Sequence, residues 1–131
     1  MVEITEDTEF YAREVLSKTY ETQIFTDEEI KDTNAHNSSI VDCRIYNLVT
    51  FFVINDLNQS VTIQVKGNRA NSVTGALDVG DSFTVAASDS GAKAIAALVD
   101  GVLPYMFAQI TAGVAPGSGD LNCYVEKKYI E

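Results

Sequence analysis

The residues best suited to acid–base or metal chemistry gather between positions 27 and 36. Asp27, Glu28, Glu29 and Asp32 precede His36, which is the single histidine of the chain. Histidine is the commonest general base and metal ligand, so one copy excludes metal sites that use two histidines. The carboxylates lack the alternating ligand spacing and the internal glycine of a calcium loop. We therefore interpret the carboxylates as solvated charge and His36 as a surface loop residue, and we expect no metal.

Residues 113–119, Gly-Val-Ala-Pro-Gly-Ser-Gly, have the composition of a loop that could cradle a phosphate. A phosphate-binding loop ends in Lys followed by Ser or Thr and leads into a helix. This segment has no such lysine and precedes an alternating run typical of a strand, so it predicts an exposed hairpin tip. The serines also lack a Gly-x-Ser-x-Gly elbow and a partner base. We predict that the protein is not an enzyme and has no catalytic residues and no cofactor.

Two cysteines, Cys43 and Cys123, fall in runs that predict strands. Their spacing matches no zinc or redox motif, which favours two buried free thiols. A bond between them stays open if their strands are neighbours, although nothing in the sequence points to an oxidising compartment.

The elements that must position these residues are short strands. Apolar residues alternate with polar ones in 61–65, 83–85 and 121–125, and a period of two places one set on each face of a pleated strand. The runs 48–54 and 104–110 are apolar on both faces, so each needs a cover on both sides: core on one, and a helix, second sheet or neighbouring subunit on the other. Between residues 88 and 101 apolar residues recur at helical spacing, which predicts one short helix or turn near 90–100.

A length of 131 residues fits one domain that buries roughly two thirds of its unfolded surface. We predict a mainly β protein, a single-domain antiparallel β-sandwich of jelly-roll-like type over residues 21–131. Residues 1–20 are expected to form an acidic arm or short helix, in which Tyr11 and Val15, then Ala12 and Leu16, lie four apart. Such a short helix is marginal in water, so it must pack on the sheet or on another subunit.

The formal net charge is −10, and residues 1–32 hold ten acids against three bases. A field of this sign repels phosphate backbones and anionic lipid, so we expect neither nucleic acid nor membrane as a partner. The acidity either maintains solubility or docks the N-terminal end on a basic partner surface. No run approaches the ~18 apolar residues of a membrane span, and the first residues are acidic where a secretory signal is basic, so we expect no Sec export.

From about Ser39 to Lys127 the order of segments resembles the small β-sandwich structural proteins of tailed bacteriophages and prophages. The resemblance rests on residues 40–53, 61–68, 78–86 and 103–125, above all on the Pro-Tyr strand followed by the Ala-Pro-x-Ser-Gly tip. It implies a non-catalytic virion component of capsid decoration or head-fibre type, assembled in the host cytoplasm. The implied partners are other copies of the chain, in a homo-oligomer, and other virion shell proteins.

Large apolar and aromatic residues in the arm and in the doubly apolar strands are the candidate assembly contacts: Phe10, Tyr11, Val15, Leu16, Phe51, Tyr105 and Phe107. An alternative is a carbohydrate- or surface-binding β-sandwich module that uses Tyr, Asn and Asp in the loops 67–81 and 113–120. A glycan-binding assay distinguishes these two functions, because an assembly protein should bind no glycan.

Overall fold

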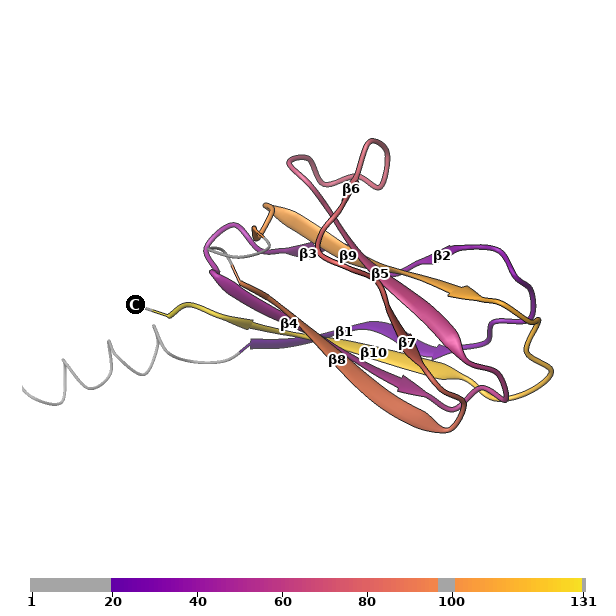
Figure 1. The fold of residues 1–131 in the computed structure, drawn as a ribbon. Coiled ribbons are helices and arrows are strands. Elements are labelled where there is room, and N and C mark those ends of the chain that lie inside the picture. Colours follow the sequence, from indigo (N-terminus) through magenta and orange to yellow (C-terminus); the bar gives the residue numbers. More distant parts are fainter. Residues whose placement is uncertain (1–19, 97–100, 131) are drawn as a thin grey trace, which may run out of the picture.

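The computed structural model describes residues 20–96 and 101–130, which form two antiparallel sheets packed face to face (Figure 1). Sheet A has four strands in the order β1 (Tyr20–Glu28), β10 (Leu121–Lys128), β4 (Leu48–Asn55) and β8 (Asp89–Ala96). In sheet B, β9 (Tyr105–Ala112) lies between β5 (Val61–Asn68) on one side and the short strands β2 (His36–Asn37) and β3 (Val41–Asp42) on the other. β6 (Leu77–Asp78) and β7 (Phe83–Val85) pair with the free side of β5. This strand order is typical of a jelly roll and confirms the predicted mainly β sandwich.

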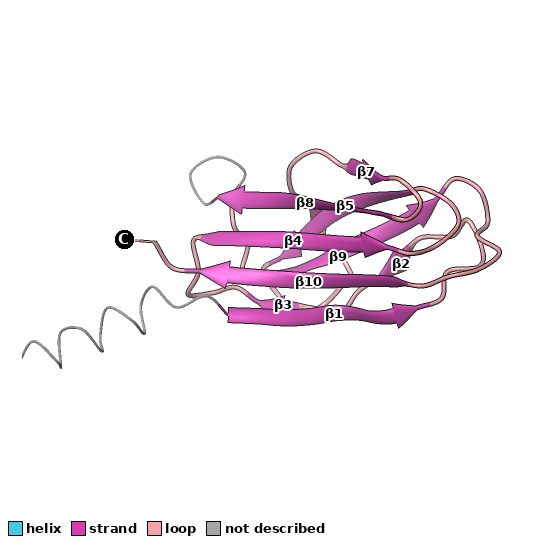
Figure 2. Ribbon diagram, turned by 90° about the horizontal axis from the view of Figure 1, so that it is seen from below, coloured by secondary structure: helices cyan, strands magenta, loops and turns pink. Residues whose placement is uncertain are grey.

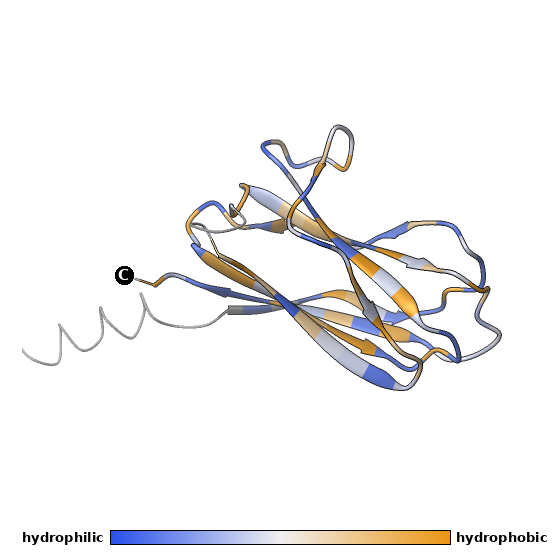
Figure 3. Cartoon of the chain, viewed as in Figure 1, coloured by the Kyte–Doolittle hydropathy of each residue, from blue (hydrophilic) through white to orange (hydrophobic). Residues whose placement is uncertain are grey.

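The core lies between the sheets and follows the alternation of the sequence. In β5, Val61, Ile63 and Val65 are buried while the intervening polar residues face outward. In β10, Leu121, Cys123 and Val125 are completely buried. Figure 3 shows the same alternation as apolar and polar bands along the strands. Because successive side chains of a strand point to opposite faces, one face of each sheet supplies the core.

The doubly apolar strand β4 is covered on one face only by the described residues. Val49, Phe51 and Val53 are 0% exposed and pack in the core, whereas Phe52 and Ile54 are 37% and 40% exposed. Both faces were predicted to be covered, but among the described residues only the inner face of β4 is.

Strand β9 differs, because both of its faces are closed by the chain itself near Phe107. Met106 and Ala108 point into the core, and Phe107, on the opposite face, is still only 1% exposed. The residue directly opposite Phe107 is Lys66 of β5, whose side chain is 22% exposed and whose ammonium lies 3.2 Å from the Asp78 carboxylate. The expected double burial of this strand is thus met without another subunit.

The expected helix near residues 90–100 is wrong for the part that the structure describes. Residues 89–96 form β8, which pairs with β4 at all eight positions. Gly91 allows β7 to pass close by, since a Cβ there would meet Val85 Cγ2 at 2.9 Å. Tertiary pairing therefore overrides the helical spacing. Residues 97–100 and the arm of residues 1–19 lie outside the described residues.

Every described element is a strand or a loop, as Figure 2 shows, so residues 20–96 and 101–130 include no helix long and apolar enough to span a membrane. The sandwich has two ends. We call the end where β1 begins and β10 finishes the proximal end, and the end with the loop 113–120 and the turn 56–60 the distal end.

At the distal end loop 113–120 is exposed at six of its eight residues, as predicted, but it is not a hairpin tip, because β9 and β10 belong to different sheets. The loop packs on the β4–β5 turn instead. The Gly117 N–H donates a hydrogen bond to Asn58 Oδ1 at 2.9 Å. Gly119 has φ of +92°, and a Cβ there would lie 2.0 Å from the carbonyl oxygen of Asp56. Glycine is therefore required at this position by both conformation and close backbone approach.

Candidate functional site

The outer face of sheet A carries an exposed apolar surface that we call the outer apolar strip: Phe52, Ile54, Ala92, Ala94 and Tyr124. Tyr124, Phe52 and Ala92 lie side by side in one row across β10, β4 and β8. Phe52 and Ile54 are large hydrophobic side chains that remain more than a third exposed. Removal of such a surface from water is favourable, so the strip is suited to contact with another protein.

The two edges of sheet A differ beside this strip. β1 shows register shifts between Gln23 and Phe25 and between Phe25 and Glu28, and Asp27 has φ of +46°. Such irregularities blunt a sheet edge. β8 is regular over its whole length, and the described residues pair with it on the β4 side alone. The open side of the strip is therefore a regular strand that has no second strand partner among the described residues.

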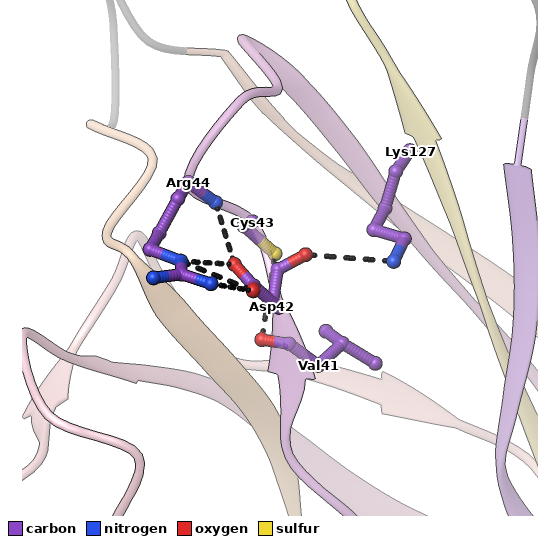
Figure 4. A network of polar contacts seen from close by, with 5 residues as sticks. All are labelled: Val41, Asp42, Cys43, Arg44 and Lys127. Atoms are coloured by element: carbon purple, nitrogen blue, oxygen red, sulfur yellow. Dashed lines mark hydrogen bonds and ion pairs between the residues drawn. The ribbon is translucent and has the colours of Figure 1, made fainter.

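A shallow pocket of about 500 Å³ at the proximal end is lined by Asp42, Arg44, Ile45, Tyr46 and Lys127. Figure 4 shows how Arg44 Nε and Nη2 donate to the Asp42 carboxylate, at 3.0 and 2.6 Å, and how Lys127 Nζ donates to the Asp42 carbonyl at 3.4 Å. The Lys127 ammonium also lies 5.1 Å from the centre of the Tyr46 ring. The pocket thus presents two cations held by an aspartate and by aromatic rings.

The electrostatics of this pocket favour binding over catalysis. Hydrogen bonds from the Arg44 side chain, then its backbone N–H, lower the pKa of Asp42, and the same pair raises the pKa of Arg44. Cys43 is buried behind the pocket, and desolvation raises the pKa of its thiol to about 12. A thiol with such a pKa stays protonated and is a poor nucleophile. The groups present can hold a carboxylate or an apolar side chain.

His36 lies in β2, which corrects its expected place in a loop. Its side chain is 25% exposed, and Nε2 lies 2.8 Å from Asp32 Oδ1. The hydrogen bond to His36 is the main cause of the lowered pKa of Asp32. Across the described ranges, no three His, Cys, Asp or Glu side chains come together in a group that could hold a metal ion. His36 is thus engaged in a local turn contact.

Both cysteines are free and buried, as the sequence indicated. Desolvation raises the pKa of the Cys123 thiol, like that of Cys43, to about 12. Neither thiol takes part in a reactive group.

The predicted assembly residues fall into three classes. Phe51 and Phe107 are buried, at 0% and 1% exposed. Their side chains are therefore not available for the assembly contacts that the sequence predicted. Tyr105 is half-buried and supports the pocket, with the Arg44 guanidinium 5.5 Å from its ring centre. Phe10, Tyr11, Val15 and Leu16 lie outside the described residues.

The exposed residues Phe52 and Ile54 were missed by sequence reasoning. β4 is apolar on both faces and therefore carries no signal of which face is inward. The signal lies in β10, where Asn122 and Glu126 mark the outer face next to Ile54 and Thr50. The register between β10 and β4 was needed to assign the outer face of β4 from this signal.

No protein-family model matches this sequence, and a search of curated proteins finds no match. Among solved structures, the fold is similar to the PBSX exported protein XepA, with a TM-score of 0.64 and 16% identity, covering 84% of this chain and 38% of that one. It is also similar to a protein of Bacillus endospore appendages that form disulfide-linked pili, with a TM-score of 0.53, 14% identity, and coverage of 87% and 91%. This chain thus spans 38% of the length of XepA. At such identities the comparisons establish a β-sandwich fold that this chain shares with these two proteins.

Proposed function

We propose that this chain is a non-catalytic structural subunit of a virion, of capsid decoration or head-fibre type. It assembles in the host cytoplasm and works through contacts with other copies and with shell proteins. The observation that carries the proposal is the outer apolar strip, which a rigid pair of sheets presents to solvent. The shared fold with PBSX exported protein XepA and with an endospore pilus protein supports a structural role without defining the particle.

The strip has the geometry of a contact surface. Its residues come from three adjacent strands in fixed register, so a partner meets a preorganised surface and little backbone entropy is lost on binding. Complete burial of a large apolar side chain contributes about 1.5–3 kcal/mol, and Phe52 and Ile54 can each supply part of this. Phe10, Tyr11, Val15 and Leu16 of the arm are proposed as a second contact.

Two of the ion pairs among the described residues are local structural contacts. Arg44 is bound to Asp42, and His36 to Asp32. No buried side-chain nitrogen or oxygen in the described ranges lacks a hydrogen-bond partner. A polar group that binds a substrate would be expected to lack such intramolecular partners. The arrangement therefore agrees with a structural role.

The test measures mass in solution by sedimentation velocity over a concentration series. The wild-type chain should self-associate, and Phe52→Asp should shift it to the monomer because a charge on the strip opposes its burial. Thr62→Asp, on the exposed outer face of sheet B, is the matched control and should behave as wild type. A wild-type chain that stays monomeric, or a control that dissociates as Phe52→Asp does, argues against the strip as the contact.

The virion role has its own test. Particles purified from the source of this gene should yield its tryptic peptides by mass spectrometry. A monomer that is absent from particles and binds glycans on an array would instead favour the carbohydrate-binding alternative.

A further inference from the structure

Three of the four sheet edges are protected from further strand pairing by their length or by their irregularity. An edge strand presents unpaired backbone N–H and C=O groups, so a regular edge can pair with a strand of another chain. In sheet B the outermost strands are β2, β3, β6 and β7, which are only two or three residues long. In sheet A, β1 is irregular, because its register with β10 shifts twice and Asp27 has φ of +46°. Short and irregular edges are both poor templates for another strand.

Strand β8, at the other edge of sheet A, has neither form of protection (Figure 2). All eight of its residues pair in unbroken register with β4, and no described strand pairs with its other side. Its outer face carries Ser90, Ala92 and Ala94, which are small and exposed, so they leave the backbone of the strand accessible. Backbone geometry alone would therefore allow a strand of another chain to add at β8.

The inner face of β8 carries a charge at the middle of the strand. Lys93 lies directly opposite Phe51 in the register, and Phe51 is 0% exposed. Because directly opposite residues of an antiparallel pair share a face, the Lys93 side chain leaves β8 on the core side of the sheet. Lys93 is accordingly half-buried, whereas its neighbours Ala92 and Ala94 are exposed. Inward-pointing charge on an edge strand is a known device against edge-to-edge pairing.

The surroundings of Lys93 leave its ammonium one way to water. Two residues earlier, Gly91 lies tightly against β7, since a Cβ there would meet Val85 Cγ2 at 2.9 Å. Two residues later, Ile95 is 0% exposed in the core. A lysine in such a place lays its carbon stem on apolar surface and keeps its ammonium solvated. With β4 and the core on one side, the ammonium can reach water past the free side of β8, in the space that an added strand would fill.

An added strand would therefore have to bury this ammonium, which is strongly unfavourable without a partner charge. The local sequence shows why such a block is useful. Lys93 is the single charged residue between Asp89 and Asp100, and this interval contains no proline. Uncharged apolar segments without proline are those most prone to pair from edge to edge, and a single charge within them opposes this.

We propose that Lys93 determines the mode of assembly by preventing strands of other chains from adding to sheet A at β8. Association between copies is then directed to the outer apolar strip, and this part of the inference rests on the proposed function. The block at β8 is a property of the edge itself and holds whether or not the strip is a contact.

The experiment removes the charge of Lys93 from full-length chains in which the strip is already disrupted. The parent is Phe52→Asp, and every variant is compared with it by sedimentation velocity over a concentration series. Phe52→Asp/Lys93→Thr should shift to larger species than the parent, because threonine is uncharged and is favoured in strands. Phe52→Asp/Lys93→Arg keeps the inward charge and should match the parent.

A second control separates the position of the charge from the net charge of the chain. Phe52→Asp/Lys31→Thr loses the same charge at a side chain that is 73% exposed, and it should also match the parent. Hydrogen exchange measured by mass spectrometry then locates the new contact. In the associated Lys93→Thr species, peptides from β8 should exchange more slowly than in the parent, while peptides from β4 and β10 should be unchanged.

Four results would overturn the proposal. Phe52→Asp/Lys93→Thr might sediment as the parent does, or the Lys93→Arg or Lys31→Thr control might associate equally. Association without slower exchange in β8 would indicate another surface, and faster exchange in β4 would indicate unfolding instead of strand addition. The strip is judged separately, by comparing wild type with Phe52→Asp. If those two sediment alike, the strip contact fails while the test of β8 remains valid.

Discussion

Asn55 at the end of β4 is the buried polar residue on which the distal end depends. Its side chain is 0% exposed. Nδ2 donates to the backbone carbonyls of Gln59 at 2.9 Å, Val85 at 3.2 Å and Ala86 at 3.1 Å. Oδ1 accepts the Leu57 N–H at 3.0 Å. One amide thus holds the β4–β5 turn and the end of β7 together.

The cost of Asn55→Ala follows from these contacts. The bonds to the Val85 carbonyl and from the Leu57 N–H are buried, so both groups lose their partner away from water. An unsatisfied buried group costs about 1–3 kcal/mol, which gives about 2–6 kcal/mol for the pair. Because small domains have about 5–15 kcal/mol of stability in all, this loss removes a large share of it.

The assay is urea unfolding followed by circular dichroism, with Asn58→Ala as the control. Asn58 makes an exposed hydrogen bond to the Gly117 N–H, so its loss should cost only about 1 kcal/mol. If Asn55→Ala lost no more free energy of unfolding than Asn58→Ala, the account of this buried amide would be refuted.

Asn55→Asp adds a pH dependence of known sign. The new carboxyl would be buried opposite three carbonyl oxygens, so its folded pKa should lie above the unfolded value of about 3.9. The folded state then binds a proton more tightly than the unfolded state. The deficit against wild type is therefore largest above the folded pKa and shrinks as pH falls toward about 4. A deficit that is constant between about pH 4 and about pH 7 would contradict this reasoning.

Three further changes are predicted from burial and backbone geometry. Gly119→Ala should lower the free energy of unfolding in urea by at least about 2 kcal/mol, because φ is +92° and the new Cβ would lie 2.0 Å from a carbonyl oxygen. Ellman's reagent at about pH 8 should label neither Cys43 nor Cys123 until denaturant is added, since both thiols are buried with pKa values of about 12; rapid labelling of the native protein would count against this. Phe51→Ala should cost about 3–5 kcal/mol by denaturation and Phe52→Ala about 1 kcal/mol or less, and similar costs would show that the assigned faces of β4 are incorrect.

Where the sequence alternates cleanly, it predicted both the strand and its inward face. β5 and β10 are examples, because their apolar and polar residues separate with a period of two. The prediction for β8 was wrong because this segment has no such clear pattern. Its small residues Ala92, Ala94 and Ala96 fit either a helix or a strand. Pairing with β4 then decided the conformation, as tertiary contacts often override weak local preference.

The candidate surfaces were predicted only in part. The sequence indicated an apolar surface on residues 48–54, but Phe51 rather than Phe52 was chosen because the strand alone has no marked face. The proximal pocket could not be found from spacing. It joins Asp42 and Arg44 to Lys127, whose hydrogen bond to the Asp42 carbonyl links positions 85 residues apart.

The sequence by itself determined a β protein with an acidic N-terminal segment, few chemically reactive groups and buried thiols, because alternation and composition are local properties of the chain. Only the tertiary structure decided which face of β4 meets solvent, that loop 113–120 closes on the β4–β5 turn, and that two cations gather where β1 begins. These features depend on strand register and on contacts between distant residues, and no local pattern encodes them.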